Sequence, residues 1–314
     1  MISIDDIAAA RTRIAPYVRH TPTLDVSGVK TVLPGTARVT LKLECLQVTG
    51  SFKARGAMNR LLGAGDLDVS KGIVTASGGN HGLAVARTAF AAGTTASIYL
   101  PSNVSPAKLT KLKAWGARTE IVGDVWDDAN AAALDYAKRT GAAYFHPFAD
   151  PLVVSGQGTL GLEIADDLPD IDTILVAIGG GGLISGLATA IKARRPGVHV
   201  IGVAPTGCPT FKLSLDAGQP MAIDKVTTRV PTMACRAADA HIFEIVRGKV
   251  EDIILVGDDE MQAAAEWLWF EMGIAADLSG AASIAAIRTG HPILSNAREI
   301  CALICGAGPD GTAT

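Results

Sequence analysis

The chain has 314 residues, of which 48% are hydrophobic, so it is long enough for two lobes with large buried cores. Its 28 basic and 31 acidic residues leave a formal net charge of −3, which gives no electrostatic basis for binding nucleic acid or an anionic membrane. The five cysteines show no metal-ligand spacing, and the amino terminus lacks the basic and apolar regions of a signal peptide. We therefore expect a cytoplasmic protein with free thiols.

The first predicted elements are a helix and a strand. Ser3 followed by Asp6 resembles a capping box and predicts a helix that ends at about Ala15. Residues 39–44 alternate between apolar and polar side chains, which is typical of a half-buried strand. A helical pattern then begins near Phe52.

From residue 73 onward, short apolar strands alternate with helices. The expected strands are 73–75, 95–100, 118–122, 142–145, 173–178, 198–203, 253–256 and 299–305. The expected helices include two that end near 92 and 194, and four at 106–115, 126–139, 258–272 and 279–288. This alternation predicts βαβ units and an α/β fold with mostly parallel sheets. We expect a small lobe at residues 72–147 and a large lobe formed by residues 1–71 and 148–314.

Lys53 is in an unusual place for a lysine, because it falls in the first turn of a predicted helix. The N-terminal end of a helix carries partial positive charge, which disfavours a protonated amine. An amine with a lowered pKa is suited to forming a Schiff base. The alternative is a solvated surface lysine, which this stretch alone does not exclude.

Four consecutive glycines, Gly179, Gly180, Gly181 and Gly182, lie between a predicted apolar strand and a helix. Without Cβ atoms, this backbone can direct several N–H groups at one anion beside a helix N-terminus, which favours a phosphate. The stretch has neither the lysine of a nucleotide P-loop nor GxGxxG spacing. The alternative is a tight turn needed for packing, although four glycines are conformationally costly for that purpose alone.

Two further segments could carry chemistry. Residues 77–82, Ser-Gly-Gly-Asn-His-Gly, form a second strand-to-helix turn whose free N–H groups suit a carboxylate, and Asn80 adds both a donor and an acceptor. The alternative is a helix entry capped by Ser77. Cys305 ends the last predicted strand, where parallel α/β sheets bind ligands, and its alternative role is that of a small buried hydrophobe.

A Schiff-base-competent lysine, a phosphate cradle and a carboxylate cradle together describe an enzyme that uses pyridoxal 5′-phosphate (PLP) to act on an amino acid. Over nearly its whole length, the chain resembles the fold-type-II PLP enzymes, which are two-lobed and tryptophan synthase β-like. Within them it is similar to the serine/threonine dehydratase branch, which includes threonine deaminase and serine racemase. Residues 51–56 match the lysine signature of that branch, residues 77–82 its substrate-carboxylate loop, and residues 179–183 its phosphate loop.

The resemblance implies a role for each of these residues. Lys53 forms the imine with PLP and then acts as the base toward the substrate Cα–H, while Phe52 packs beside the cofactor ring. Asn80 hydrogen-bonds the 3′-oxygen, and Cys305 faces the pyridine nitrogen. The remaining residues bind the two anionic groups: Gly179, Gly180, Gly181 and Gly182 hold the phosphate, and Ser77, Gly78, Asn80 and His81 contact the substrate carboxylate, largely through backbone. We expect no catalytic role for the His81 side chain.

A thiol at position 305 has a chemical consequence. Because it is neutral, it cannot keep a proton on the pyridine nitrogen, and the cofactor is then a milder electron sink. The expected reaction is β-elimination, by which L-threonine or L-serine gives a 2-oxo acid and ammonia. The cofactor phosphate, or Lys53 once protonated, would donate a proton to the departing hydroxyl.

Three departures from the branch pattern bear on this expectation. Serine racemase has a proton-transferring serine where this chain has Gly78, so racemisation is disfavoured. Many members have a metal-binding carboxylate where this chain has Ala204, so we expect no metal there. Asp277 lies near the position of a family glutamate; its role is open, and a surface or capping acid is the simpler interpretation.

Only nine residues follow Cys305, so we expect no C-terminal regulatory domain.

Several alternatives remain open at this point. The substrate could be a bulkier 3-hydroxy amino acid such as phenylserine or 3-hydroxyaspartate, and the reaction could be racemisation or β-replacement. A non-catalytic protein that binds a phosphate-bearing ligand is the alternative outside enzymes. The substrate side chain depends on a pocket that we expect to include the loops after Val203 and at 228–236, and the family suggests a homodimer.

Overall fold

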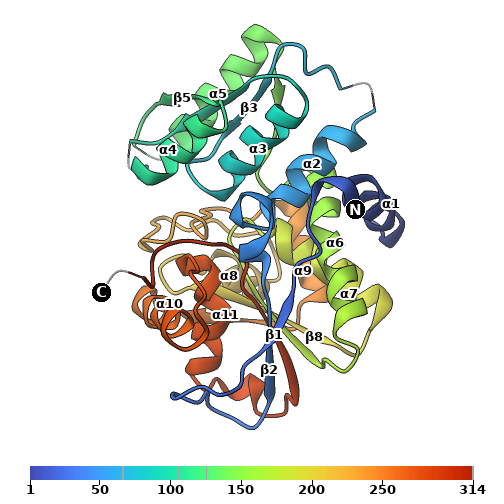
Figure 1. Ribbon diagram of the computed structural model, residues 1–314, viewed down its shortest axis with the longest axis vertical. Coiled ribbons are helices and arrows are strands. Elements are labelled where there is room, and N and C mark those ends of the chain that lie inside the picture. The colour runs from blue at the N-terminus through green and yellow to red at the C-terminus, as the bar shows by residue number, and fades with distance from the viewer. Residues whose placement is uncertain (66, 103, 105, 125, 313–314) are drawn as a thin grey trace.

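Two β-sheets organise the computed structural model, which describes residues 1–65, 67–102, 104, 106–124 and 126–312 (Figure 1). The six-stranded sheet has the order β1-β2-β10-β7-β8-β9. Its strands are β1 (Thr23–Asp25), β2 (Arg38–Lys42), β7 (Thr173–Ala177), β8 (His199–Pro205), β9 (Asp252–Val256) and β10 (Glu299–Leu303). β1 pairs with β2 in antiparallel fashion, and the other neighbouring strands are parallel, as the sequence predicts.

The second sheet has four parallel strands in the order β5-β4-β3-β6. These strands are β3 (Ile73–Ala76), β4 (Ala96–Leu100), β5 (Arg118–Ile121) and β6 (Ala143–Tyr144). They alternate with α3 (Asn80–Ala91), α4 (Pro106–Ala114) and α5 (Trp126–Thr140). These elements form the upper part of the molecule in Figure 1.

The remaining helices belong to the part of the chain that surrounds the six-stranded sheet. They are α1 (Ile4–Ile14), α2 (Lys53–Gly63), α6 (Pro151–Asp167), α7 (Gly182–Arg194), α8 (Thr210–Ala217), α9 (Ala240–Lys249), α10 (Asp258–Met272) and α11 (Leu278–Arg288). Short 3-10 helices occur at Ala15–Tyr17, Glu44–Leu46, Val48–Gly50 and Pro292–Leu294. The expected capping box of α1 is confirmed: the Ser3 hydroxyl accepts from the Asp6 N–H at 3.1 Å, and the Asp6 carboxylate accepts from the Ser3 N–H at 2.8 Å.

The sequence did not predict α6, α9 or β1. Glycines inside α6 lower its intrinsic helix propensity, but they let it approach its neighbours closely. A Cβ on Gly156 would lie 2.7 Å from the Cα of Gly56 in α2, and a Cβ on Gly186 in α7 would lie 2.3 Å from the Val154 carbonyl of α6. Helix α6 therefore packs backbone to backbone against both α2 and α7.

The expectation that residues 39–44 form a half-buried strand is wrong, because β2 is buried on both faces. Thr40 is 6% exposed and Lys42 is fully buried. The Lys42 ammonium donates to the Thr21 carbonyl at 2.6 Å, to Glu163 at 2.7 Å and to Asp167 at 2.8 Å. These partners satisfy the buried charge and let the polar face pack against α6.

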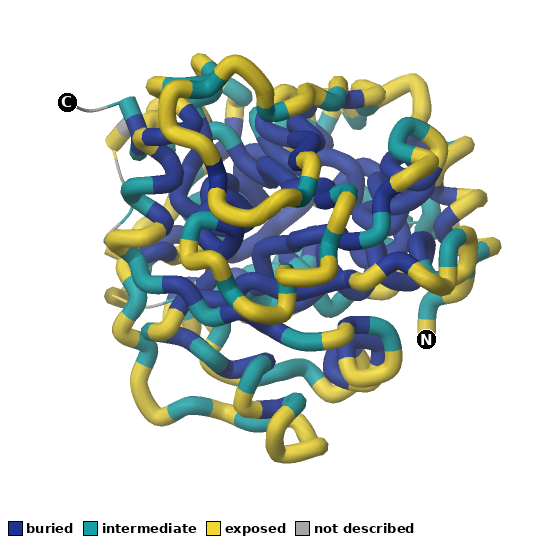
Figure 2. The backbone as a smooth tube through the Cα atoms, turned by 90° about the horizontal axis from the view of Figure 1, so that it is seen from below, coloured by how far each residue is buried: buried dark blue, intermediate teal, exposed yellow. Residues whose placement is uncertain are grey.

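Each sheet has its own hydrophobic core. The larger core lies around the six-stranded sheet, and a smaller one, which includes Leu83, Ile98 and Phe145, packs α3 against the four-stranded sheet. Figure 2 shows the buried backbone in the interior and the exposed segments around it. In the described part of the chain, none of the helices has the length and apolar character that a membrane span requires.

Candidate active site

The N-termini of three helices bring the predicted site residues together. Lys53 is the first residue of α2, Asn80 is the first residue of α3, and Gly182 is the first residue of α7. The backbone N–H groups in the first turn of a helix have no acceptor within that helix. Such N-termini are therefore suited to anions and disfavour a protonated amine.

Lys53 is partly buried, and its side chain reaches the segment that follows β6. Its Nζ donates to the Pro147 carbonyl at 2.7 Å and lies 5.2 Å from the centroid of the Phe52 ring. Burial lowers the pKa of the Lys53 amine from 10.5 to about 8. The pKa shift has the expected direction, but its cause is burial and not the helix N-terminus that the sequence suggested, and the alternative of a solvated surface lysine is wrong.

The four glycines are packed from behind by neighbouring backbone and side chains. A Cβ on Gly180 would lie 2.3 Å from the Phe148 ring, and one on Gly182 would lie 2.6 Å from the Phe148 carbonyl. Gly181 adopts a left-handed conformation with φ of 80° as the N-cap of α7. The turn therefore needs glycine for packing, and it also places the N-terminus of α7 where its free N–H groups could hold a phosphate.

The turn at residues 77–82 enters α3 in a similar way. The Ser77 hydroxyl accepts from the Gly79 N–H at 3.3 Å. The His81 ring turns inward, where Nε2 lies 3.2 Å from the Phe145 carbonyl, and burial lowers the His81 pKa to about 3. A neutral, buried imidazole leaves the His81 backbone N–H as the group that could contact a carboxylate, in keeping with the prediction that the ring is not catalytic.

The segment at 230–236 lies against both glycine-rich turns. A Cβ on Gly179 would lie 2.8 Å from the Thr232 carbonyl, and a Cβ on Gly79 would lie 3.4 Å from the Thr232 methyl group. The thiol of Cys235 interacts electrostatically with Lys53. This segment therefore lies near the amine, and its contribution to a substrate pocket stays a prediction.

Cys305 lies two residues beyond the end of β10, rather than at its last residue as predicted. The Phe52 N–H donates to the Cys305 carbonyl at 3.3 Å, which places the cysteine beside the start of α2. Its Sγ donates to the Ser279 carbonyl at 3.4 Å. Burial, followed by the nearby Asp277 carboxyl, raises the pKa of the Cys305 thiol well above its usual range, so the group is a neutral thiol.

Asp277 is a buried capping residue, so the interpretation as a capping acid is correct and that as a surface acid is wrong. It is 7% exposed and caps α11 by accepting from the Gly280 N–H at 2.6 Å. Its other carboxyl oxygen accepts from Asn80 Nδ2 at 2.8 Å. The sequence signal was the position of an aspartate directly before a helix, but nothing in the sequence indicated its contact with Asn80.

Sequence reasoning also missed His146, whose ring lies near the Lys53 amine. Its Nδ1 accepts from the N–H groups of Phe148 at 3.2 Å and Ala149 at 2.9 Å, which leaves the proton on Nε2. Burial, and next the positive charge of Lys53, lower the His146 pKa. The only available signal was its place shortly after a predicted strand of the small sheet, at the carboxyl end where ligands bind.

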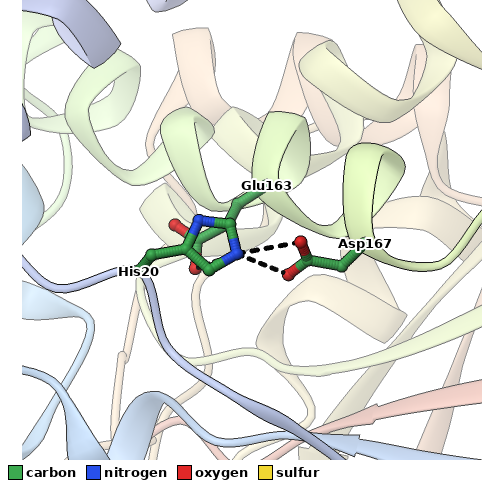
Figure 3. A group of neighbouring side chains, drawn as sticks. All are labelled: His20, Glu163 and Asp167. Carbon is green, nitrogen blue, oxygen red and sulfur yellow. Dashed lines mark hydrogen bonds and ion pairs between the residues drawn. The ribbon is translucent and has the colours of Figure 1, made fainter.

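His20, Glu163 and Asp167 could in principle bind a metal, because their ligand atoms lie within 4.8 Å of one another (Figure 3). Protein cations already neutralise these carboxylates. Lys42 contacts both of them, and Arg55 Nη2 lies 2.9 Å from Glu163. We therefore interpret this cluster as an ion-pair network.

Arg55 connects that network to the start of α2. Its guanidinium donates to both oxygens of Glu44, at 2.8 and 2.7 Å. Arg55 and Glu44 are both almost completely buried, and Arg55 lies two residues after Lys53. The network therefore fixes the first turn of the helix that carries the amine.

These residues fit PLP, the cofactor that the resemblance implies. A buried amine, an anion-binding turn, an amide and a neutral thiol lie around one place, which suits the aldehyde, the phosphate, the 3′-oxygen and the pyridine nitrogen, respectively. The donor set is also appropriate, because the phosphate would meet backbone N–H groups without a competing carboxylate among the four glycines.

Comparisons with known proteins agree with this geometry. A family model described as "Pyridoxal-phosphate dependent enzyme" matches residues 14–306. The L-threonine ammonia-lyase of Thermotoga maritima is 38% identical over 287 residues, which cover 91% of this chain and 71% of that protein. The catabolic L-threonine dehydratase TdcB of Staphylococcus aureus is 34% identical over 321 residues, which cover 99% of this chain and 90% of that protein.

Solved structures are similar over nearly the whole chain. Maize serine racemase has a TM-score of 0.91 at 32% identity, with coverage of 97% of this chain and 93% of that one. A threonine deaminase of T.th. has a TM-score of 0.90 at 34% identity, with coverage of 98% of each chain. The expected two-lobed, fold-type-II architecture is confirmed, and the alternative of a non-catalytic phosphate-binding protein is wrong. The chain belongs to the family of pyridoxal-phosphate dependent enzymes.

Proposed function

We propose that this enzyme is an ammonia-lyase that dehydrates and deaminates L-threonine or L-serine to a 2-oxo acid and ammonia. The observation that carries the proposal is the position of the Lys53 amine beside an anion-binding turn, a carboxylate-suited turn and a neutral thiol. The names of the relatives, L-threonine ammonia-lyase and L-threonine dehydratase, support the reaction and the substrate.

The residues of this chain would divide the work as follows. Bound PLP supplies an electron sink that acidifies the substrate Cα–H. Because burial lowers the pKa of Lys53 to about 8, a minority of this amine is already neutral near physiological pH, far more than for an ordinary lysine, and the neutral Nζ can accept the Cα proton. Once protonated, Nζ can donate that proton to the departing hydroxyl group.

The other groups orient and hold the cofactor and the substrate. The N–H groups of Gly179 to Gly182, at the N-terminus of α7, would bind the phosphate, and the first-turn N–H groups of α3 would bind the substrate carboxylate. Asn80 would donate to the 3′-oxygen, and Phe52 would pack beside the ring. The neutral Cys305 thiol would face the pyridine nitrogen without fixing a proton there, which favours elimination over transamination.

Gly78 favours elimination over racemisation. A racemase needs a second proton carrier on the side of the substrate opposite the lysine, and glycine has no side chain for this task. A Cβ at this position would lie 3.1 Å from Val104, so a small side chain would fit only with a slight shift of that valine. The similarity to maize serine racemase therefore extends to the fold and does not imply its reaction.

We further propose that residues 72–147 form the small domain and that residues 1–71 and 148–314 form the large one. The four-stranded sheet, which runs from Ile73 to Tyr144, and its separate core support this division.

We also propose a cytoplasmic homodimer. Five free cysteines support the location, and light scattering of the purified protein would test the dimer.

A steady-state assay tests the reaction directly. Purified enzyme loaded with PLP should release equal amounts of ammonia and 2-oxo acid from L-threonine or L-serine, without an added nucleophile. Lys53→Ala should lower this activity on the order of a thousandfold or more, because the proton carrier is removed. Lys71→Ala, an exposed lysine, serves as the matched control and should retain full activity.

The same assay can contradict the proposal. Preferred turnover of phenylserine or 3-hydroxyaspartate would show that the substrate is a bulkier amino acid. Conversion of L-serine to D-serine as the main reaction would identify a racemase. Full activity of Lys53→Ala would show that another residue carries the chemistry.

A further inference from the structure

A buried hydrogen bond connects the two sheet-bearing parts of the chain beside Cys305. Asn80 begins α3, which packs on the four-stranded sheet, and Asp277 caps α11, which packs on the six-stranded sheet. Asn80 Nδ2 donates to Asp277 Oδ2 at 2.8 Å, and the two residues are 8% and 7% exposed. Neither residue can therefore easily exchange this partner for solvent.

The Asp277 carboxyl group is held in place by its own helix. Its Oδ1 accepts from the Gly280 N–H at 2.6 Å and from the Ser279 hydroxyl at 2.7 Å. Rotation of the carboxyl group would break this cap of α11. Oδ2 is consequently a fixed acceptor aimed at Asn80.

A fixed acceptor determines which way the Asn80 amide points. Only the NH₂ end of the amide can donate to Asp277, so the carbonyl end must point elsewhere. One of the two Nδ2 hydrogens is used for this bond, and the second remains available to another acceptor. Without Asp277, the amide could turn over and present its carbonyl oxygen instead.

The segment that follows β10 lies close to Asn80 and Asp277 and leaves no room for a side chain there. A Cβ on Gly306 would lie 2.7 Å from Asn80 Nδ2 and 2.7 Å from Asp277 Oδ2. Gly306 directly follows Cys305, and Ser51 forms an isolated bridge with Gly306 two residues before Lys53. The amide and the carboxyl group therefore lie next to the segments that carry the amine and the thiol.

We propose that Asp277 is a positioning residue that keeps an N–H donor of Asn80, rather than its carbonyl oxygen, turned toward the 3′-oxygen of bound PLP. This inference rests on the proposed role of Asn80. A donor stabilises the ionised 3′-oxygen, whereas a carbonyl oxygen would repel it. Asp277 would thus control the electronic state of the cofactor without touching it.

Titration of the apoenzyme with PLP tests the inference without any turnover. Asp277→Ala should weaken PLP binding about tenfold, the change expected when one oriented hydrogen bond is lost. It should also shift the visible absorbance of bound PLP in the same direction as Asn80→Ala. The double variant should be no worse than Asn80→Ala alone, because the two residues act through one contact.

A second variant separates orientation from helix capping. Asp277→Asn keeps one acceptor oxygen, which is enough to cap α11, but presents its NH₂ group to that of Asn80. Its apoenzyme should unfold near the wild-type temperature, while the absorbance of bound PLP shifts as in Asp277→Ala. Ser3→Ala is the matched control: it removes the exposed cap of α1 and should leave PLP affinity and absorbance unchanged.

Two outcomes would overturn the proposal. If both Asp277 variants bind PLP with wild-type affinity and absorbance, Asp277 is a helix cap alone. If the effects of Asp277→Ala and Asn80→Ala on PLP affinity simply add, the residues act separately. Neither result depends on the substrate, so a failure here is distinct from a failure of the proposed ammonia-lyase activity.

Discussion

Lys53 and Lys42 show how surroundings decide the use of a lysine. Lys42 is fully buried, but its ammonium meets Glu163, Asp167 and a carbonyl oxygen, which compensate its charge. The Nζ of Lys53 meets the Pro147 carbonyl, and burial lowers its pKa to about 8. The first lysine is a structural cation, and the second can act as a nucleophile and a base.

This pKa predicts the pH dependence of cofactor loading. Only the neutral amine attacks an aldehyde, so the rate at which PLP binds covalently to the apoenzyme should rise with pH, with a midpoint near pH 8. The rate is followed by the absorbance of the imine, and Lys53→Ala should give no such signal. A midpoint near 10.5, the ordinary value for lysine, would contradict the burial argument.

At the scale of the elements, close packing explains the unpredicted helix α6. Its glycines weaken the helical signal in the sequence, and each contributes where another backbone approaches closely. The stabilisation of α6 therefore arises from its contacts with α2 and α7, which a local sequence pattern does not contain. The helix α10 has local start and stop signals, an acidic first turn and the left-handed Gly273 after its last residue, and it has the predicted bounds of Asp258–Met272.

Two glycine-to-alanine substitutions test this explanation. Gly186→Ala in α7 would place a methyl group 2.3 Å from the Val154 carbonyl, and should lower the free energy of unfolding by about 1–3 kcal/mol. Gly248→Ala in α9 meets nothing within 4 Å, and should raise that free energy by about 0.5–1 kcal/mol. Urea unfolding measures both changes, and equal effects of the two variants would be inconsistent with backbone-to-backbone packing.

The sequence was sufficient for the parallel strands, most helices and the segments that meet at the site. Their signals are local: apolar runs between turns, a lysine at a helix start and glycines between a strand and a helix. It was not sufficient for the ion network or for the bond between Asn80 and Asp277, because these join side chains that are far apart in the chain. The same reason explains the error on β2, whose polar face is buried by partners on distant segments.

At the scale of the whole molecule, the ion network makes stability depend on pH. Burial alone would raise the pKa of Glu163, but Arg55 and Lys42 more than offset this and lower it from 4.5. Above pH 4.5 this carboxylate contributes its full stabilisation, which is lost as the pH falls through the lower value in the folded protein. Acid should therefore weaken the contacts that fix the start of α2.

Glu163→Gln tests this linkage. Because glutamine does not titrate, the free energy of unfolding of this variant should fall less steeply than that of the wild type as the pH decreases below 4.5. Urea unfolding at a series of pH values gives both slopes. Glu244→Gln, which removes an exposed carboxylate paired with Arg247, should leave the acid slope unchanged. Parallel curves for Glu163→Gln and the wild type would contradict the assignment.

Helix α6 packs against both α2, which carries the reactive amine, and α7, whose N-terminus would hold the phosphate. At the glycines, main-chain atoms of α6 approach α2 and α7 directly, and the side chains of Gln157 and Asn59 add hydrogen bonds between α6 and α2. The span between the helix that carries the amine and the helix that would hold the phosphate therefore depends on this close main-chain packing. Variation on the outer surface of the protein should leave that span untouched, whereas a single added methyl group at this seam would change it.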